Sequence, residues 1–146
     1  MKKELVAELN KYLANVGVAY IKTHNLHWNV VGLSFKQTHE YLESLYDEYA
    51  EILDAVAELL KMFNETPLAS LKSYLEVADL KELEESAEIG EKEALKIALE
   101  DVLHLREEAY KARELAEGDT PSATGLLEGN IAFYDKAQWF LKSMLK

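Results

Sequence analysis

Apolar residues recur at steps of three and four through long stretches of this chain, and this spacing constrains its fold more than any other feature. One stretch places apolar side chains at Leu5, Leu9, Tyr12, Leu13, Val16, Tyr20, Leu26 and Val30. Another places them at Leu42, Leu45, Tyr49, Ile52, Val56, Leu59 and Leu60. Because an α-helix turns once in about 3.6 residues, each set lines one face of a helix that can be buried.

The breaks between these stretches predict the order of the helices. Long helices are expected at about 3–30, 35–63, 91–117 and 122–145, with a short helix at 70–77. Gly32 ends the first helix and Ser34 is a candidate N-cap for the second, while Pro67 and Pro121 both fall in connectors. The prediction is an all-α single domain over residues 1–146. It is a four-helix bundle with a short helix in the connection between the second and third long helices.

The composition narrows the chemistry that such a bundle can carry. The chain has no cysteine, so any metal must be held by His, Asp or Glu, which favours iron, manganese, magnesium or calcium and permits zinc. Its net charge of −11 repels nucleic acid and attracts cations. No apolar run approaches the roughly 20 residues of a membrane helix, and the start MKKELVAELN lacks the apolar region of a signal peptide. We therefore expect a cytoplasmic protein.

Histidine and carboxylate residues with metal-ligand spacing gather where the first two predicted helices meet. His27 lies near the end of the first helix and His39 in the first turns of the second. Glu43 follows His39 by four residues and shares its helix face, and Asp54 and Glu58 form another such pair further along.

The distance between these two pairs implies a second subunit. His39 and Asp54 are 15 residues apart on one helix, hence roughly 22 Å apart, so one ion cannot bind both within a chain. Yet 15 steps of about 100° leave them only about 60° apart around the axis. If two such helices pack antiparallel across a two-fold axis near Glu48 and Tyr49, each pair meets the other pair of the partner chain. Two equivalent sites result.

Simpler explanations of the same residues stay open at this point. Glu43, Asp54 and Glu58 lie on an acidic helix and can be ordinary solvated carboxylates. A lone His39 can be an ordinary surface or core residue. His24 and His27, three residues apart, can also form a metal-binding pair by themselves.

The run from His24 to Leu60 resembles the signature of the Dps family of mini-ferritins. The matching positions are His27-Trp28, Gly32, Phe35, His39-Glu40, Leu45-Tyr46-Asp47-Glu48 and Asp54-Ala55-Val56-Ala57-Glu58. The segment from Tyr134 to Trp139 also resembles this family, so the resemblance spans nearly the whole chain. It implies a ferritin-like four-helix bundle and a hollow homo-oligomeric cage of twelve subunits built from two-fold dimers.

The resemblance also implies a ferroxidase site at each dimer interface. By match to the motif, one subunit supplies His27, His39 and Glu43, and its mate supplies Asp54 and Glu58. The reaction that the resemblance implies is binding of Fe²⁺ by these residues and its oxidation, usually by hydrogen peroxide in preference to dioxygen, for storage as a ferric mineral. Zinc is a possible substitute for iron. The family commonly has Asp at the position of Glu43. The extra methylene of Glu43 is expected to shift the second iron site.

The remaining residues have weaker assignments. Trp28 is a candidate acceptor of stray oxidising equivalents or a core residue, whereas Trp139 is expected to be structural. His24 is a candidate zinc ligand or a residue behind the ligands. His104 follows Asp101 by three residues, as in the acid-x-x-His element of ferritins, but the full ferritin set is missing, so we expect His104 to be structural.

Iron entry and DNA binding are the last two features that the resemblance raises. The resemblance implies acidic iron-entry pores at the three-fold axes of the cage, near the start of the last helix. The acids nearest to that position are Glu117, Asp119 and Glu128, and Gly125 stands where relatives carry an acidic residue. The termini offer few lysines, so weak or absent DNA binding is expected. The alternative functions are a DNA-binding, nucleoid-protecting Dps protein with a secondary iron function, and a plain acidic helical bundle that serves as an interaction module.

Overall fold

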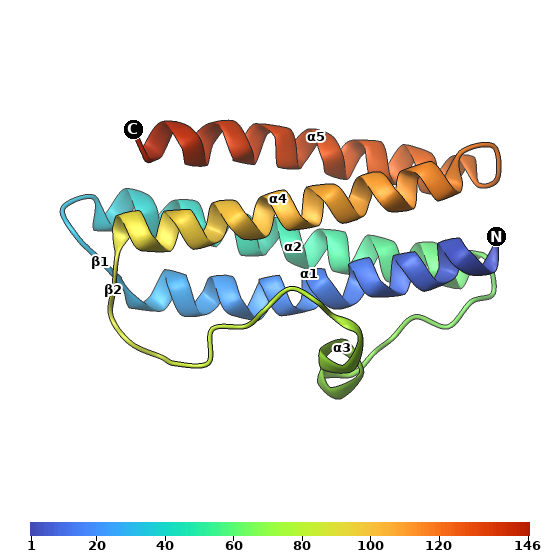
Figure 1. Cartoon of the computed structure of the whole chain (residues 1–146), viewed down its shortest axis with the longest axis horizontal. Helices are drawn as coiled ribbons and strands as arrows, with labels where there is room; N and C mark the ends of the chain where they lie inside the picture. Colours follow the sequence, from blue (N-terminus) through green and yellow to red (C-terminus); the bar gives the residue numbers. More distant parts are fainter.

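The computed structural model describes residues 1–146 and contains four long helices with short elements in the links. The elements are α1 (Lys3–Asn29), β1 (Val30–Val31), α2 (Phe35–Met62), α3 (Leu71–Val77), β2 (Ile89–Gly90), α4 (Glu91–Ala116) and α5 (Pro121–Met144). The helices α1 and α2 run antiparallel, as do α4 and α5, and the connection between the pairs returns along the whole bundle (Figure 1). The predicted all-α bundle with a short helix in its second connection is confirmed.

The core lies between the four long helices and contains the predicted apolar stripes. Every residue of the two predicted stripes is buried except Tyr20, which is half-buried. In the same core a hydrogen bond of 2.6 Å joins the hydroxyls of Tyr12 in α1 and Tyr134 in α5, and the Asn130 amide donates to Tyr12. These polar atoms therefore satisfy one another inside the apolar core. None of the helices is both long and apolar enough to span a membrane.

A two-residue parallel ladder, which the sequence did not predict, joins the α1–α2 turn to the start of α4. Val30 pairs with Ile89 and Val31 with Gly90. Beside it Gly32 has a φ of +149°, and a Cβ there would lie 2.6 Å from the Glu91 carboxylate. Ser34 is the N-cap of α2 as expected, but its side chain makes no capping hydrogen bond. Instead, the Ser34 backbone N–H donates to Glu91 at 2.9 Å.

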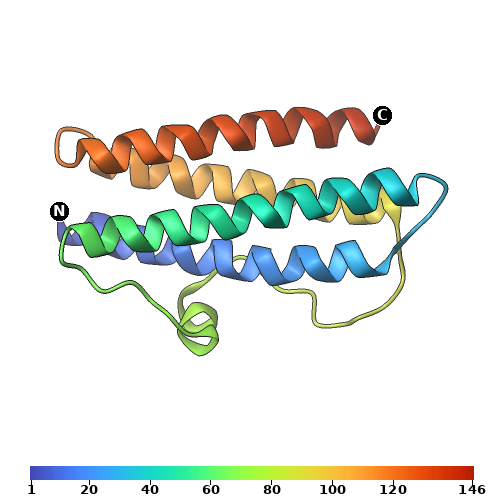
Figure 2. The ribbon, with the colours of Figure 1, turned by 180° about the vertical axis from the view of Figure 1, so that it is seen from behind.

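Asparagine side chains of α1 hold the long connection, which runs beside α1 in both views (Figures 1 and 2). The fully buried Asn15 accepts hydrogen bonds from the backbone N–H groups of Asp79 and Leu80 at 2.9 and 3.0 Å. Its amide also donates to the Asp79 carboxylate at 2.9 Å. Asn10 accepts from the Leu68 N–H at 2.8 Å, so an extended segment without its own backbone partners is still satisfied.

The short helix α3 rests on a glycine in the middle of α1. A Cβ on Gly17 would lie 2.7 Å from the Tyr74 ring, so only glycine allows this close approach. Ser70 caps α3 through a reciprocal pair of hydrogen bonds with Ser73, which fixes where the helix begins. Gly17 therefore costs α1 some helix propensity but allows α3 to pack against it.

A buried ion pair connects α1 to α4. Lys22 Nζ lies 2.9 Å from Asp101 Oδ1, and the two side chains are 9% and 7% exposed. Burial raises the pKa of the Asp101 carboxyl from 3.8 to about 6, although Lys22 opposes the shift. Because the folded protein holds this proton more tightly than the unfolded chain, the stability contributed by Asp101 falls as pH rises from about 4 to about 6.

Removing one partner of this ion pair should lower the free energy of unfolding far more than replacing both partners with apolar residues. Asp101→Leu leaves the Lys22 ammonium buried without a partner, so we expect a loss of about 3–5 kcal/mol in the free energy of unfolding. Lys22→Met combined with Asp101→Leu should lose much less, because no charge stays buried. Urea unfolding measures both, with the more exposed Arg106–Asp135 pair as a control that contributes about 1 kcal/mol or less. A double variant as unstable as Asp101→Leu would contradict this account.

Candidate metal centre

His27 at the end of α1 and His39 in α2 are fixed by a reciprocal pair of hydrogen bonds. The Nδ1 of His27 lies 2.7 Å from the carbonyl oxygen of His39, and the Nδ1 of His39 lies 2.8 Å from the carbonyl oxygen of His27. The rings are stacked with centroids 3.6 Å apart and planes 12° from parallel. The structure therefore brings together two residues that are twelve positions apart in the sequence.

These hydrogen bonds determine which ring nitrogen is free. A carbonyl oxygen can only accept, so the Nδ1 of each ring must carry the proton. In the neutral imidazole the Nε2 of each ring then keeps its lone pair. This is the arrangement found in metal-binding histidines, whose second nitrogen donates to a backbone carbonyl or a carboxylate.

Glu43 lies beside this histidine pair. Its Oε1 is 3.8 Å from the Nε2 of His27, and its side chain is 52% exposed. Two ligands that are each about 2.1 Å from one ion can lie at most about 4.2 Å apart, so this pair can share an ion. The extra methylene relative to Asp therefore does not keep the carboxylate away from His27.

Tyr46 belongs to this site, although its position in the sequence had suggested no role for it. Its hydroxyl donates to Glu43 Oε1 at 3.3 Å, and its ring stacks on His24 with centroids 3.7 Å apart. The signal was present in the sequence, because Tyr46 follows Glu43 by three residues and so lies on the same helix face. Tyr46 thus helps to orient the Glu43 carboxylate.

The two other predicted ligands lie elsewhere on α2. Asp54 and Glu58 are both exposed, and the helix separates them from His39 by the roughly 22 Å expected from their spacing. The structure therefore does not bring them to His27, His39 and Glu43 within one chain. Each chain carries two separate parts of the predicted ligand set.

The other aromatic and histidine residues near the site occupy different settings. His24 Nδ1 donates to the Tyr20 carbonyl at 2.7 Å, so His24 is held behind Tyr46. Trp28 is 70% exposed and is therefore not a core residue of this chain. Trp139 is also exposed, at 64%, and contacts the edge of Phe140.

The acids expected near an iron pore already have partners within the chain. Glu117 and Glu128 both pair with Arg113, at 2.6 and 2.9 Å. Asp119 accepts a hydrogen bond from the Lys2 backbone N–H at 3.2 Å. Gly125 is exposed and has no heavy atom within 4 Å of where a Cβ would lie. These contacts reduce the charge that the acids can offer to a passing cation.

Comparison with known proteins gives similarity over the whole chain. A family model described as Ferritin-like domain matches residues 6–146. The chain is 34% identical to DNA protection during starvation protein 2 of Bacillus anthracis, with 99% of both sequences covered. The crystal structure of a Dps protein from Bacillus brevis is similar with a TM-score of 0.91 and 34% identity over 100% of both chains.

A third similar structure carries a description of its chemistry. It is a Dps protein from Vibrio cholerae O1, described as a member of a broad superfamily of ferritin-like diiron-carboxylate proteins. The TM-score is 0.91 and the identity 28%, with 99% of this chain and 90% of that chain covered.

A mixing experiment with Co²⁺ as a probe tests whether metal binding needs two chains. His39→Ala and Asp54→Asn should each abolish the visible Co²⁺ absorption of the site. When the two variants are co-expressed, half of the dimers should pair one variant with the other. Each mixed dimer has one intact site and one doubly defective site, so about a quarter of the sites should recover.

The control for this experiment is Glu51→Gln, which removes an exposed α2 carboxylate outside the ligand set. It should bind Co²⁺ like the unchanged protein. If co-expression restores no absorption, the ligands do not come from two chains.

Proposed function

Since this chain belongs to the Dps family of ferritin-like proteins, we propose that it oxidises ferrous iron between paired subunits and stores the ferric product in a twelve-subunit cage. The observation that carries this proposal is the reciprocal hydrogen bonding of His27 and His39. It prepares two imidazole nitrogens for a metal beside the exposed Glu43 carboxylate. The description of the Vibrio cholerae relative as a diiron-carboxylate protein agrees with this ligand chemistry.

The exposed apolar residues of α2 and its flanks support pairing with a second chain. Leu33 is fully exposed and Phe35 is 42% exposed, next to the His39 end of α2. Met62 at the opposite end is 68% exposed, followed by Phe63 at 37%. An antiparallel partner helix would bring one apolar end against the other and remove both from water. The same packing carries Asp54 and Glu58 of one chain to His27, His39 and Glu43 of the other.

The proposed ligands suit both oxidation states of iron. Neutral imidazole holds Fe²⁺, whereas hard carboxylate oxygens favour Fe³⁺, so the mixed set binds the substrate and promotes its oxidation. Two ferrous ions held together can give one electron each to hydrogen peroxide, which takes up two protons and becomes two water molecules. No hydroxyl radical is released when both electrons arrive in one event. The protein would thus remove iron and peroxide together in the cytoplasm and protect the cell against oxidative stress.

Peroxide is the oxidant that we propose for this site, with dioxygen as the slower alternative. Zinc takes the same nitrogen and oxygen ligands and has no redox chemistry, so Zn²⁺ would occupy the site and inhibit it.

Removing one ligand from each half of the site tests the ferroxidase function. His27→Ala combined with Asp54→Ala should slow peroxide-driven Fe²⁺ oxidation by more than the roughly 10- to 100-fold loss caused by removing a group that only orients a ligand. Stopped-flow absorbance of the ferric product measures the rate. Light scattering confirms that the variant still assembles, and Glu51→Gln serves as the matched control. An unchanged oxidation rate in the assembled double variant would refute the ferroxidase assignment.

The name of the Bacillus anthracis relative favours a second candidate function, the protection of DNA by direct binding, with iron oxidation secondary. The charge of this chain opposes that function. It has 27 acidic residues against 16 Lys and Arg, which gives −11 for each chain. A cage multiplies this charge, and binding to phosphates requires positive charge at the contact.

A gel-shift assay distinguishes the two functions. At neutral pH and about 0.15 M salt, the assembled protein should leave duplex DNA unretarded, because its net charge repels the phosphates. The same preparation should oxidise Fe²⁺. Tight, salt-sensitive retardation would make DNA binding part of the function.

A further inference from the structure

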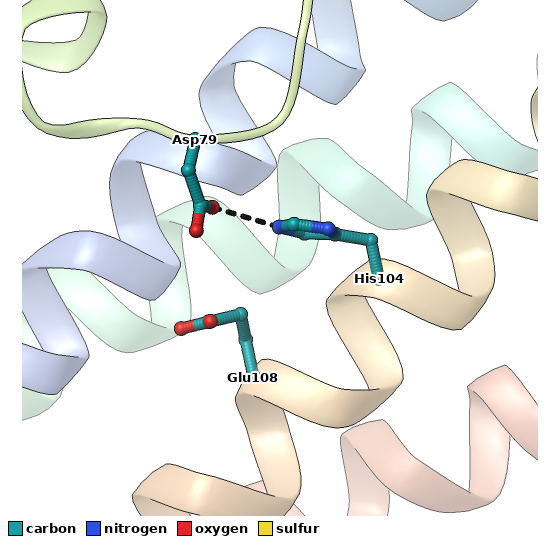
Figure 3. Close-up of side chains that lie close together, drawn as sticks. All are labelled: Asp79, His104 and Glu108. Carbon is teal, nitrogen blue, oxygen red and sulfur yellow. Dashed lines mark hydrogen bonds and ion pairs between the residues drawn. The ribbon is translucent and has the colours of Figure 1, made fainter.

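A second group of imidazole and carboxylate side chains lies far along the chain from the interface ligands. Asp79 belongs to the connection, whereas His104 and Glu108 lie one turn apart on the same face of α4. The His104 ring points toward Asp79, and the Glu108 carboxylate extends from α4 to the same side, in the space between the connection, α4 and α1 (Figure 3). From the sequence, His104 was expected to be structural because the full ferritin ligand set is missing. Spacing gave no indication of Asp79, which lies 25 residues away in the connection.

The three side chains are close enough to share an ion. One ligand atom from each lies within 4.8 Å of the ligand atoms of the other two, and His104 Nε2 is 2.7 Å from Asp79 Oδ1. A shared ion would bring them to at most about 4.2 Å, which requires movements of less than about 1 Å. Asp79 can make that movement because its side chain is half exposed on a loop.

A positive charge already occupies this position. Lys11 Nζ in α1 lies 3.2 Å from Asp79 Oδ2 and 3.2 Å from Glu108 Oε1, so one ammonium bridges both carboxylates. The Lys11 side chain is 31% exposed, and its flexible stem allows the ammonium to move into solvent. The place between the carboxylates therefore suits a cation that can compete with Lys11.

Glu108 shares its buried surroundings with a second acid, Glu8 of α1. The Glu108 side chain is only 2% exposed, and its Oε2 and the Oε1 of Glu8 are both buried. Burial, together with a hydrogen bond to Glu108, raises the pKa of Glu8 to about 7, so Glu8 can hold a proton that the two acids share. A metal ion bound at Glu108 would stabilise this buried carboxylate in place of that proton.

We propose that Asp79, His104 and Glu108 bind a divalent transition-metal ion, such as Zn²⁺ or Fe²⁺, that displaces the Lys11 ammonium. One imidazole and two carboxylates are ligands that these ions accept, with water completing the coordination. Binding at His104 Nε2 breaks the hydrogen bond that this atom donates to Asp79, and in the neutral ring the proton then lies on Nδ1. The site lies within one chain and is separate from the interface site.

Bound metal would fasten the connection to the bundle. Asp79 is the only ligand from the connection, and its neighbour Leu80 is buried in the core. An ion that binds the folded chain alone stabilises the fold in proportion to the logarithm of its concentration. The connection would therefore be held more firmly when metal is abundant.

Zn²⁺ titration of the assembled His27→Ala/Asp54→Ala protein tests the proposal without interference from the interface site. We expect about one Zn²⁺ for each chain, measured by equilibrium dialysis with elemental analysis. His104→Gln in this background should weaken binding more than about tenfold, since a ligand is lost rather than a group that orients one. Asp79→Asn provides a second variant at an exposed position. Glu51→Gln is the matched control, because this exposed carboxylate lies outside both ligand sets, and it should leave binding unchanged.

Lys11→Met separates a metal site from a purely structural ion-pair network. Without the ammonium the two carboxylates repel each other, so the melting temperature should fall in the absence of metal. Zn²⁺ should restore it, and Zn²⁺ should bind more tightly than in the parent protein because its competitor is gone. With His104→Gln added, Zn²⁺ should restore nothing. The proposal is wrong if the parent protein retains no Zn²⁺, if His104→Gln leaves binding unchanged, or if Glu51→Gln abolishes it.

Discussion

The stiffness of one unbroken helix determines the arrangement on which the proposed chemistry depends. Throughout Phe35–Met62, α2 keeps His39 and Asp54 at a fixed separation, and no loop movement can bring them together. A chain can therefore hold only part of the proposed site. If the ligands are those proposed, oxidation depends on assembly, and an isolated subunit is unable to generate ferric ions outside the cage.

The faces of the helices and their approximate ends were accessible from sequence because they depend on local spacing. The buried stripe from Leu42 to Leu60 and the positions of α3 and Ser34 follow from periodicity and capping preferences. The separation of the two ligand groups also follows from helix geometry alone. Such features require no knowledge of which helix lies beside which.

Contacts between distant segments were not accessible in this way. The sequence contains Gly17 in the middle of a helix, but only the position of Tyr74 explains it. Ser34 was expected to cap α2 through its side chain, whereas the carboxylate of Glu91, 57 residues away, binds its backbone N–H. The reciprocal hydrogen bonds of His27 and His39 likewise depend on how the α1–α2 turn places two backbones. These are consequences of packing rather than of local preference.

Those reciprocal hydrogen bonds also restrict how this part of the chain can change in evolution. Each imidazole donates to the backbone carbonyl of the other histidine, so both hydrogen bonds depend on the length of the segment between His27 and His39. A residue added or deleted in its helical part, between Phe35 and His39, would turn His39 by about 100° around α2, and a change in the turn would move α2 along α1; either change would break both bonds. Surface loops usually tolerate such changes, and the long connection that α1 holds through asparagine side chains has that freedom over much of its length. The short turn between α1 and α2 lacks this freedom. We therefore expect its length to vary much less between related chains than the identity of its exposed residues.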